Sequence, residues 1–222
     1  MTKGNLVLAF SVLLILIIGM LQAQAQEVIP TYKIQIDKGW NLIYRFYNPS
    51  EQILPDSEVK SSDIKAIYGF VPTVQKYVEV YPNIQDDGNF NKYGIDDGYL
   101  ADGGFWVYSD KSGFLSYTGL EEETPISNRQ LYKGWNFVGI SHEMLNTFVE
   151  SGTCEIERMF YCERGQWDIL TEDILSSVGM SYNKFNVADN EQDVGHVVLV
   201  KVGENCMLDL SSETINPPPI PN

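Results

Sequence analysis

Downstream of residue 30, hydrophobic and polar residues alternate in short runs that are typical of β-strands rather than helices. Tyr32, Ile34 and Ile36 alternate with polar residues, and a glycine-marked bend then leads into Leu42, Ile43, Tyr44 and Phe46. Further runs, joined by turn residues, predict strand pairs at 64–70 with 75–81, 104–108 with 114–117, 155–162 with 167–170, and 195–200 with 207–210. The pattern therefore predicts a mainly β fold.

One four-residue motif occurs twice and marks the start of two similar halves. Residues 38–41, Lys-Gly-Trp-Asn, return as residues 133–136, and residues 90–93, Phe-Asn-Lys-Tyr, are matched by Tyr-Asn-Lys-Phe at 182–185. The offsets are 133 − 38 = 95 and 182 − 90 = 92 residues, so two separate matches agree on nearly one spacing. We interpret the chain as a tandem duplication of two small β-sheet or barrel-like modules, each with a short helix.

The duplication divides the chain into five segments. An acidic stretch that ends near Pro125 and a Pro-rich C-terminal stretch both have the composition of exposed, unpacked chain. The predicted segments are a signal peptide at 1–25, a first β-rich module at 26–118, a linker at 119–127, a second β-rich module at 128–210 and a Pro-rich tail at 211–222.

The short helix of the second module is predicted between Ser141 and Gly152. Ser141 suits the start of a helix, apolar residues follow at helical spacing, and Gly152 suits its end. In the first module, prolines interrupt the corresponding stretch, so only a turn or two around residues 57–62 is expected.

The first residues of the chain predict export. Lys3 precedes an apolar run over residues 6–21, and small residues up to Ala25 offer a cleavage site, so we expect cleavage after Ala25 and a secreted protein. The alternative is an uncleaved N-terminal anchor, although the run of 21 − 5 = 16 residues is shorter than the roughly 17 to 25 that a spanning helix needs. Any membrane attachment would come through this segment.

The chain is strongly acidic, with a formal net charge of −15, which makes nucleic acid and anionic membrane surfaces unfavourable partners. Acidic residues gather in residues 86–102, where oxygen-bearing side chains alternate as at the start of a calcium loop. Lys92 and Gly98 stand where such a loop needs its glycine and its closing glutamate, so an acidic surface turn is the preferred interpretation. The candidate ligands of the alternative calcium site are Asp86, Asp87, Asn89, Asn91, Asp96 and Asp97.

Three cysteines, Cys154, Cys162 and Cys206, allow one disulfide in an exported chain. Cys154 and Cys162 flank one predicted strand, and eight residues at about 3.3 Å each place them roughly 26 Å apart, whereas a disulfide needs Cα atoms within about 7 Å. Cys206 is therefore expected to pair with one of the other two. Zinc binding is not expected, because the cysteines and the two histidines lack the spacing of a zinc site.

The numerous aromatic residues allow two interpretations. Large rings on the strands of a small β domain usually pack in the core, and we assign the four tryptophans, at 40, 106, 135 and 167, to packing. Exposed rings can instead stack on sugars or form interfaces, and Tyr93, Tyr99 and Tyr108 are the candidates for ligand binding.

These motifs resemble a repeated β-rich module of secreted and cell-surface proteins of bacteria and archaea, which opens with a Gly-Trp-Asn-Leu strand and closes with a Gly-x-Gly-Tyr-Trp-Val strand. Trp40 and Trp135 match the opening, and residues 103–107 resemble the closing strand. The second half departs from it at His196 and Val197, where the closing aromatic residues are missing. The resemblance implies a place outside the cell, often as an accessory module of larger proteins, and implies no catalytic activity.

No set of residues in the sequence indicates catalysis. His142 and His196 lack a Ser or Cys in a nucleophile context, so we expect no enzymatic activity and keep a small hydrolase as the disfavoured hypothesis. The predicted function is a non-catalytic secreted or cell-surface interaction or structural module whose partner is an envelope or extracellular protein or a glycan. The alternative is a calcium- or carbohydrate-binding module that uses residues 86–102 and the nearby tyrosines, with calcium as its cofactor.

Overall fold

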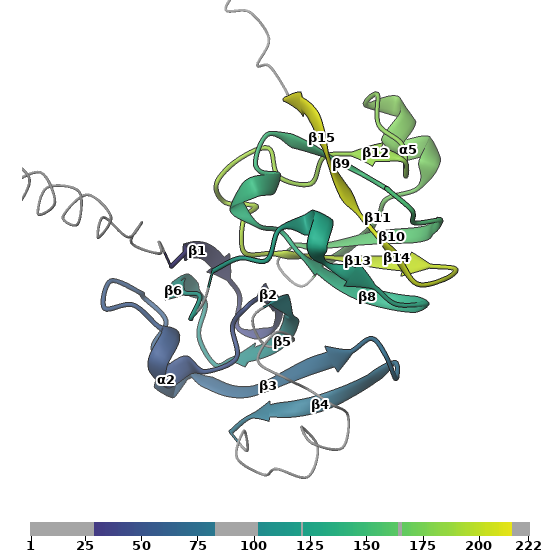
Figure 1. The fold of residues 1–222 in the computed structure, drawn as a ribbon. Coiled ribbons are helices and arrows are strands. Elements are labelled where there is room, and N and C mark those ends of the chain that lie inside the picture. The colour runs from purple at the N-terminus through teal and green to yellow at the C-terminus, as the bar shows by residue number, and fades with distance from the viewer. Residues whose placement is uncertain (1–28, 83–101, 121, 164–165, 215–222) are drawn as a thin grey trace, which may run out of the picture.

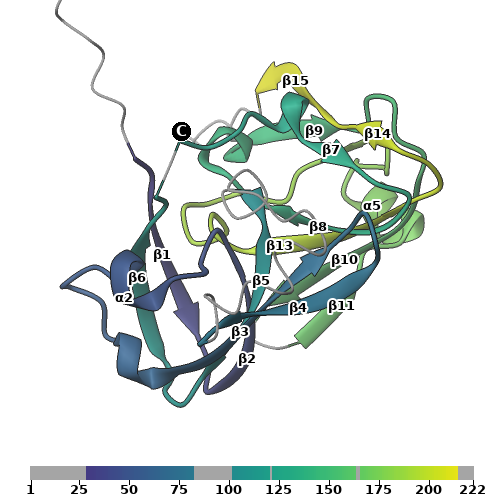
Figure 2. The same ribbon diagram turned by 60° about the horizontal axis from the view of Figure 1, so that its bottom comes forward.

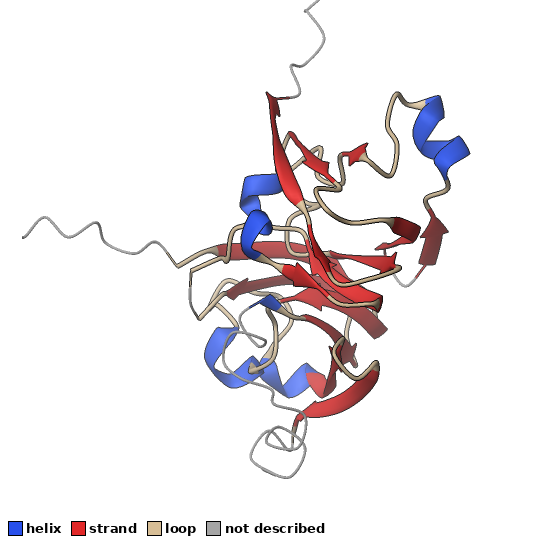
Figure 3. Cartoon of the chain, turned by 45° about the vertical axis from the view of Figure 1, so that its right-hand side comes forward, coloured by secondary structure: helices blue, strands red, loops and turns tan. Residues whose placement is uncertain are grey.

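The structure is a computed structural model that describes residues 29–82, 102–120, 122–163 and 166–214. It is mainly β, as the alternation of hydrophobic and polar residues predicted. Two four-stranded antiparallel sheets, one from each half of the chain, lie one above the other and form the centre of the molecule (Figure 1). The helices of the described residues are few and short (Figure 3).

The first half contains a four-stranded sheet of order β2-β5-β3-β4 and a separate strand pair, β1-β6. Its helical elements, α2 (Pro49–Gln52) and a 3-10 helix at Ser61–Asp63, lie between β2 and β3. The strands are β1 (Thr31–Ile36), β2 (Gly39–Tyr44), β3 (Ile64–Val71), β4 (Lys76–Tyr81), β5 (Gly104–Ser109) and β6 (Gly113–Thr118).

The second half repeats this order of strands and adds a third sheet. The four-stranded sheet has the order β8-β13-β10-β11, and the separate pair is β7-β14 (Figure 2). The added sheet has the order β12-β9-β15, and its strands are labelled in Figure 1. The elements are β7 (Gln130–Leu131), β8 (Gly134–Gly139), a 3-10 helix (His142–Met144), β9 (Thr147–Glu150), β10 (Ile156–Glu163), β11 (Gln166–Ile169), α5 (Glu172–Ser177), β12 (Lys184–Phe185), β13 (Val197–Val202), β14 (Cys206–Met207) and β15 (Asp209–Thr214).

The Gly-Trp-Asn motif forms the same bend in both halves. Asn41 accepts a hydrogen bond from the Asp37 N–H (2.9 Å) and donates to the carbonyl oxygens of Asp37 (2.8 Å) and Gly39 (3.1 Å). Asn136 makes the three equivalent bonds at 2.8, 2.7 and 3.2 Å. Gly39 and Gly134 have φ angles of 111° and 101°, which favour glycine. Glycine and asparagine therefore recur together because the asparagine amide closes a bend that only glycine enters without strain.

The two halves pack against each other through complementary pairs of large and small residues. Tyr44 lies against Gly139, where an added Cβ would be 1.8 Å from the Tyr44 ring atom Cδ2, and Val197 lies against Gly104, where it would be 2.9 Å away. Tyr44 pairs with Gly104 across β2 and β5, just as Gly139 pairs with Val197 across β8 and β13. Each contact therefore joins corresponding positions of the two halves, with the large residue in one half and glycine in the other.

Through these contacts the hydrophobic core of the first half extends into the second half. The core cluster of the first half includes Cys162, Val194 and Val197 from the second, all almost fully buried. Tyr117 of β6 also donates a hydrogen bond from its hydroxyl to the Tyr44 carbonyl oxygen (2.8 Å) at this contact. The halves are therefore not independent domains joined by a free linker.

The prediction of a helix between Ser141 and Gly152 is wrong. A single 3-10 turn at His142–Met144 is followed by β9, which lies between β12 and β15 in the added sheet. Val149 is buried there and pairs with residues on both sides, so backbone pairing decides the conformation of a stretch whose apolar spacing also suits a helix. The two halves do contain short helices, at α2, where Pro49 occupies the first turn, and at α5, where the Thr171 side chain accepts from the Ile174 N–H (3.3 Å).

In the two predicted closing hairpins, 104–108 with 114–117 and 195–200 with 207–210, the segments do form strands, but these strands do not pair with each other. β5 lies between β2 and β3, whereas β6, which follows it in the chain, pairs with β1 along its whole length. In the second half, β14 likewise pairs with β7 and β15 with β9. Alternation along one strand says which face is buried but not which strand lies beside it, so only the local hairpins β3-β4 and β10-β11 are confirmed.

The segment 119–127, predicted to be an exposed linker, is held to both halves. The buried Arg45 donates to the Glu122 carbonyl oxygen (2.9 Å), and the buried Arg129 donates to the Thr124 carbonyl oxygen (2.7 Å). Ile126 is completely buried. At the other end, β15 continues to Thr214 and so takes up the start of the stretch predicted as a tail.

The expected disulfide is confirmed and joins Cys154 to Cys206, with Cα atoms 5.0 Å apart. It connects the loop before β10 to β14, and Cys162 lies on β10, buried in the shared core. In the portion of the chain that the structure describes, no helix is long and apolar enough to cross a membrane.

Candidate functional site

Most residues that the sequence singled out for ligand binding lie outside the described residues. These are the calcium candidates Asp86, Asp87, Asn89, Asn91, Asp96 and Asp97, and the tyrosines Tyr93 and Tyr99. Asp102, at the end of the acidic stretch, is described and lies 3.8 Å from Arg45, where it accepts a hydrogen bond from the Thr124 N–H (3.3 Å). Asp102 thus holds the segment between the halves. Of the three tyrosine candidates, Tyr108 is the one that can be placed.

Tyr108 belongs to a group of three aromatic rings on adjacent strands, which we call the Trp40 cluster. It consists of Trp40 on β2, Tyr108 on β5 and Tyr68 on β3, and these strands are neighbours in the first sheet. The Trp40 ring centroid lies 5.2 Å from that of Tyr108 and 5.9 Å from that of Tyr68, with interplanar angles of 73° and 64°. The contacts are edge-to-face, an arrangement that stabilises aromatic pairs.

Trp40 is 44% exposed, so its assignment to the core is wrong. Asn41 turns its side chain inward to hold the bend, and successive side chains of a strand point to opposite faces, so Trp40 must point the other way. On that face Leu42 and Tyr44 are buried against the second half, but the second half does not extend over the end that carries Trp40. The Asn that follows the Trp in the motif is the sequence signal that could have revealed this orientation.

The polar atoms of the Trp40 cluster are available to a ligand. Within the described chain, no hydrogen bond uses the Trp40 indole N–H, the Tyr68 hydroxyl or the Tyr108 hydroxyl. Both tyrosines are half-buried. The cluster therefore combines a fixed apolar ring surface with three hydrogen-bonding groups that the fold itself does not use.

A second aromatic row connects the two sheets and differs from the Trp40 cluster. The ring centroids of Trp106 in the first sheet and Trp167 in the second are 5.6 Å apart. The Phe160 ring continues the row, with its centroid 6.3 Å from that of Trp167 and 5.7 Å from that of Trp135. Trp167 is 42% exposed, so its assignment to the core is also wrong; it lies on β11, at the edge of its sheet. Trp135, which corresponds to Trp40 in the repeat, is half-buried beside Phe160.

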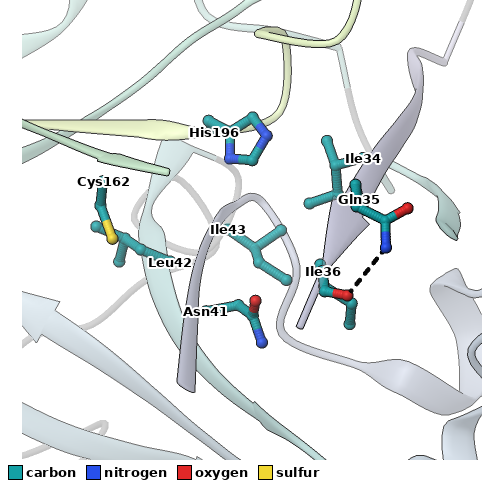
Figure 4. A pocket seen from close by; sticks show the side chains of 8 residues that line it. All are labelled: Ile34, Gln35, Ile36, Asn41, Leu42, Ile43, Cys162 and His196. Atoms are coloured by element: carbon teal, nitrogen blue, oxygen red, sulfur yellow. Dashed lines mark hydrogen bonds between the residues drawn. The ribbon is translucent and has the colours of Figure 1, made fainter. Parts of the chain in front are cut away.

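The pocket between the halves is too small to be a ligand site. Its volume of about 10 Å³ has room for about one water molecule. Asn41 lines it, but its amide already holds the bend (Figure 4). The full lining is Ile34, Gln35, Ile36, Asn41, Leu42, Ile43, Cys162 and His196.

A polar cluster at the junction of the halves also has a structural role. The Glu123 carboxylate accepts hydrogen bonds from the Tyr32 hydroxyl (2.7 Å) and from the His142 backbone N–H (3.2 Å), and the His142 ring atom Nδ1 lies 3.1 Å from it. The cluster ties β1, the connecting segment and the 3-10 helix together. No three His, Cys, Asp or Glu side chains of the described chain are arranged to hold a metal ion.

These contacts shift the pKa values of both charged groups. Burial raises the pKa of Glu123, but the hydrogen bonds from His142 and Tyr32 outweigh it and hold that pKa below its ordinary value of 4.5. The hydrogen bond to Glu123 raises the pKa of His142 above 6.5, against the opposing effect of burial, and the nearby Glu191 raises it further. The lowered pKa of Glu123 and the raised pKa of His142 therefore widen the pH range over which both groups are charged.

We expect the stability of the wild-type protein to decrease as pH rises from 6 through the folded-state pKa of His142. A group whose pKa is raised by folding stabilises the folded state below its unfolded pKa, and this contribution is lost above its folded pKa. In His142→Gln this step should disappear. Because His142 is 41% exposed, the step should be below ~1 kcal/mol. Urea unfolding of both proteins at pH 6 and pH 9 measures this step. His196 is present in both proteins, so its contribution cancels in the comparison. An equal change in the free energy of unfolding between the two pH values in both proteins would contradict the assignment to His142.

Comparison of the chain with protein families, with curated proteins and with solved structures gives no match. The interpretation of the site therefore depends on its geometry and chemistry. The Trp40 cluster is the strongest candidate, because it is exposed, rigidly held and chemically unused by the fold.

Proposed function

We propose that this chain is an exported, non-catalytic binding protein and that the Trp40 cluster is its contact surface. The observation that carries the proposal is the exposure of Trp40 on the edge strand β2, beside Tyr108 and Tyr68 on the next two strands of the same sheet. Tryptophan and tyrosine are the residues that most often dominate binding energy, because they bury a large rigid surface and also offer a polar atom. A sheet holds such rings more firmly than a loop does.

Three features support export and a passive scaffold. The N-terminal apolar run followed by small residues is typical of a signal peptide, and the disulfide Cys154–Cys206 suits an oxidising compartment. The shared strand order of the two halves supports descent from a duplicated module. The second half packs its own four-stranded sheet against the back of Leu42 and Tyr44, and this gives the first sheet a firm support.

The proposal is tested by removing the Trp40 ring. We expect Trp40→Ala to lower the affinity of the purified protein for its envelope or extracellular partner by at least about thirtyfold, which corresponds to the ~2 kcal/mol loss of a binding hot spot. Trp167→Ala is the matched control, because Trp167 is an equally exposed tryptophan outside the Trp40 cluster. Immobilised wild-type, Trp40→Ala and Trp167→Ala proteins are compared for retention of envelope components and purified glycans.

Melting temperatures of the three proteins establish that each is folded. The proposal is supported if Trp40→Ala alone loses a partner that the wild type retains. It is contradicted if Trp40→Ala, still folded, retains every component that the wild type binds.

A further inference from the structure

We infer that the ligand of the Trp40 cluster is a single neutral sugar ring, stacked on the exposed face of Trp40 and hydrogen-bonded by the Tyr68 and Tyr108 hydroxyls. The inference depends on the proposed function of this surface and adds the chemical class of its ligand. It is drawn from the tilt of the rings, from their unused polar atoms and from the local charge.

The tilt of the rings determines the size of the ligand. Both tyrosine rings are inclined by 64° or more to Trp40, so the three rings do not form a flat platform. A planar array of polysaccharide chains needs coplanar rings, and this cluster cannot offer them. One ligand ring can stack on the open face of Trp40 while its edge meets the two tyrosines. The geometry therefore fits one sugar residue.

The unused polar atoms separate a sugar from an apolar protein side chain. An apolar side chain pressed onto the cluster would remove the Tyr68 and Tyr108 hydroxyls and the Trp40 indole N–H from water without giving them partners, at a cost of about 1–3 kcal/mol for each group. A pyranose avoids this cost, because its C–H face covers the ring while its hydroxyl groups lie around the rim and pair with these atoms. Aromatic faces carry negative potential and attract such C–H groups.

The charges favour a neutral sugar. Two lysines that flank the cluster along its strands have partners within the fold: Lys65 forms an ion pair with Asp110 (3.3 Å). The Lys111 ammonium donates to the Glu58 carbonyl oxygen (2.6 Å). With a net charge of −15, the protein as a whole disfavours acidic sugars.

The test is a titration of the purified protein with neutral monosaccharides and short neutral glycans, followed by saturation-transfer NMR and by tryptophan fluorescence. We expect at least one neutral sugar to bind the wild type and Trp40→Ala to abolish its signal. Tyr68→Phe and Tyr108→Phe, which remove the hydroxyl groups alone, should each weaken binding by about three- to tenfold, the range for one hydrogen bond. Tyr77→Phe is the matched control, because Tyr77 is an exposed tyrosine on the edge strand β4, outside the cluster.

Each outcome bears on one of the two proposals. If no neutral sugar binds, but Trp40→Ala loses an envelope polypeptide that the wild type retains, the sugar inference is overturned and the binding surface stands. If a sugar binds equally well to the wild type and to Trp40→Ala, its site lies elsewhere and the inference is overturned. Loss of binding in Trp40→Ala with unchanged binding in both Tyr→Phe variants overturns the role of the hydroxyls. Unaltered melting temperatures show that each variant is folded.

Discussion

Replacing Gly139 by alanine should destabilise the protein by roughly 3 kcal/mol, at the upper end of the range for overpacking a core. The added methyl group would lie 1.8 Å from Cδ2 of Tyr44 and within 2.3 Å of two further ring atoms. The Tyr44 ring has little room to move aside, because it is completely buried and packs edge-to-face against the Tyr32 ring, with centroids 6.0 Å apart. Urea unfolding followed by tryptophan fluorescence gives the change in the free energy of unfolding.

Gly203→Ala is the control for the Gly139 variant, since the nearest atom to its added Cβ would be a Glu157 oxygen at 3.4 Å, an ordinary contact. A double-mutant cycle separates the clash from other effects: Tyr44→Ala alone leaves a cavity, and in Tyr44→Ala/Gly139→Ala the new methyl group meets no ring. The double variant should therefore be more stable than the sum of the two single effects predicts. Additive effects would show that Tyr44 and Gly139 do not contact each other in solution.

Removing the disulfide should cost about 4 kcal/mol. Cys154 and Cys206 are 52 residues apart, and the disulfide closes a loop of this length in the unfolded chain. The entropy that the unfolded chain loses in this way corresponds to about 4 kcal/mol of stability at 25 °C. The double variant Cys154→Ala/Cys206→Ala tests this, with the free energy of unfolding measured against the wild type. Adding a reductant should destabilise the wild type to a similar extent and leave the double variant unchanged. An unaltered free energy in the double variant would contradict the prediction.

The sequence determines the strands of this fold well and their neighbours poorly. The strand at Tyr32 to Ile36 follows from apolar residues at every second position, since one of its faces is buried. The partner of β6 does not follow from such a pattern, because β1 and β5 offer equally apolar faces. Val149 shows the same limit: its neighbours are spaced as in a helix, and only pairing with β12 and β15 makes the segment a strand.

The candidate site was partly accessible from the sequence. The sequence marks Tyr108 as a candidate ligand-binding residue, but it places Trp40 in the core and gives no signal at Tyr68. Whether Trp40 is buried depends on how far the second half covers the first sheet, which is a property of the packing between halves. The turn-holding role of Asn41 carried the missing information, since it fixes the face on which the tryptophan lies.

The charged residues at the junction show that the composition of a segment does not predict whether it is exposed. The acidic segment 119–127 reads as solvated chain, yet the buried Arg45 and Arg129 bind its backbone carbonyl groups. No sequence motif links either arginine to the carbonyl group that it binds. The polar contacts that fasten the halves together therefore appear only in three dimensions.

The complementary large and small residues at the junction also determine which halves can pack together. If two first halves met through the same surface, Tyr44 would face Tyr44 and the rings would overlap; two second halves would place Gly139 opposite Gly139 and leave a void. Only a first half joined to a second half fills the space. Such a junction favours closure within one chain over exchange of like halves between chains, and once both positions had diverged, neither half could replace the other.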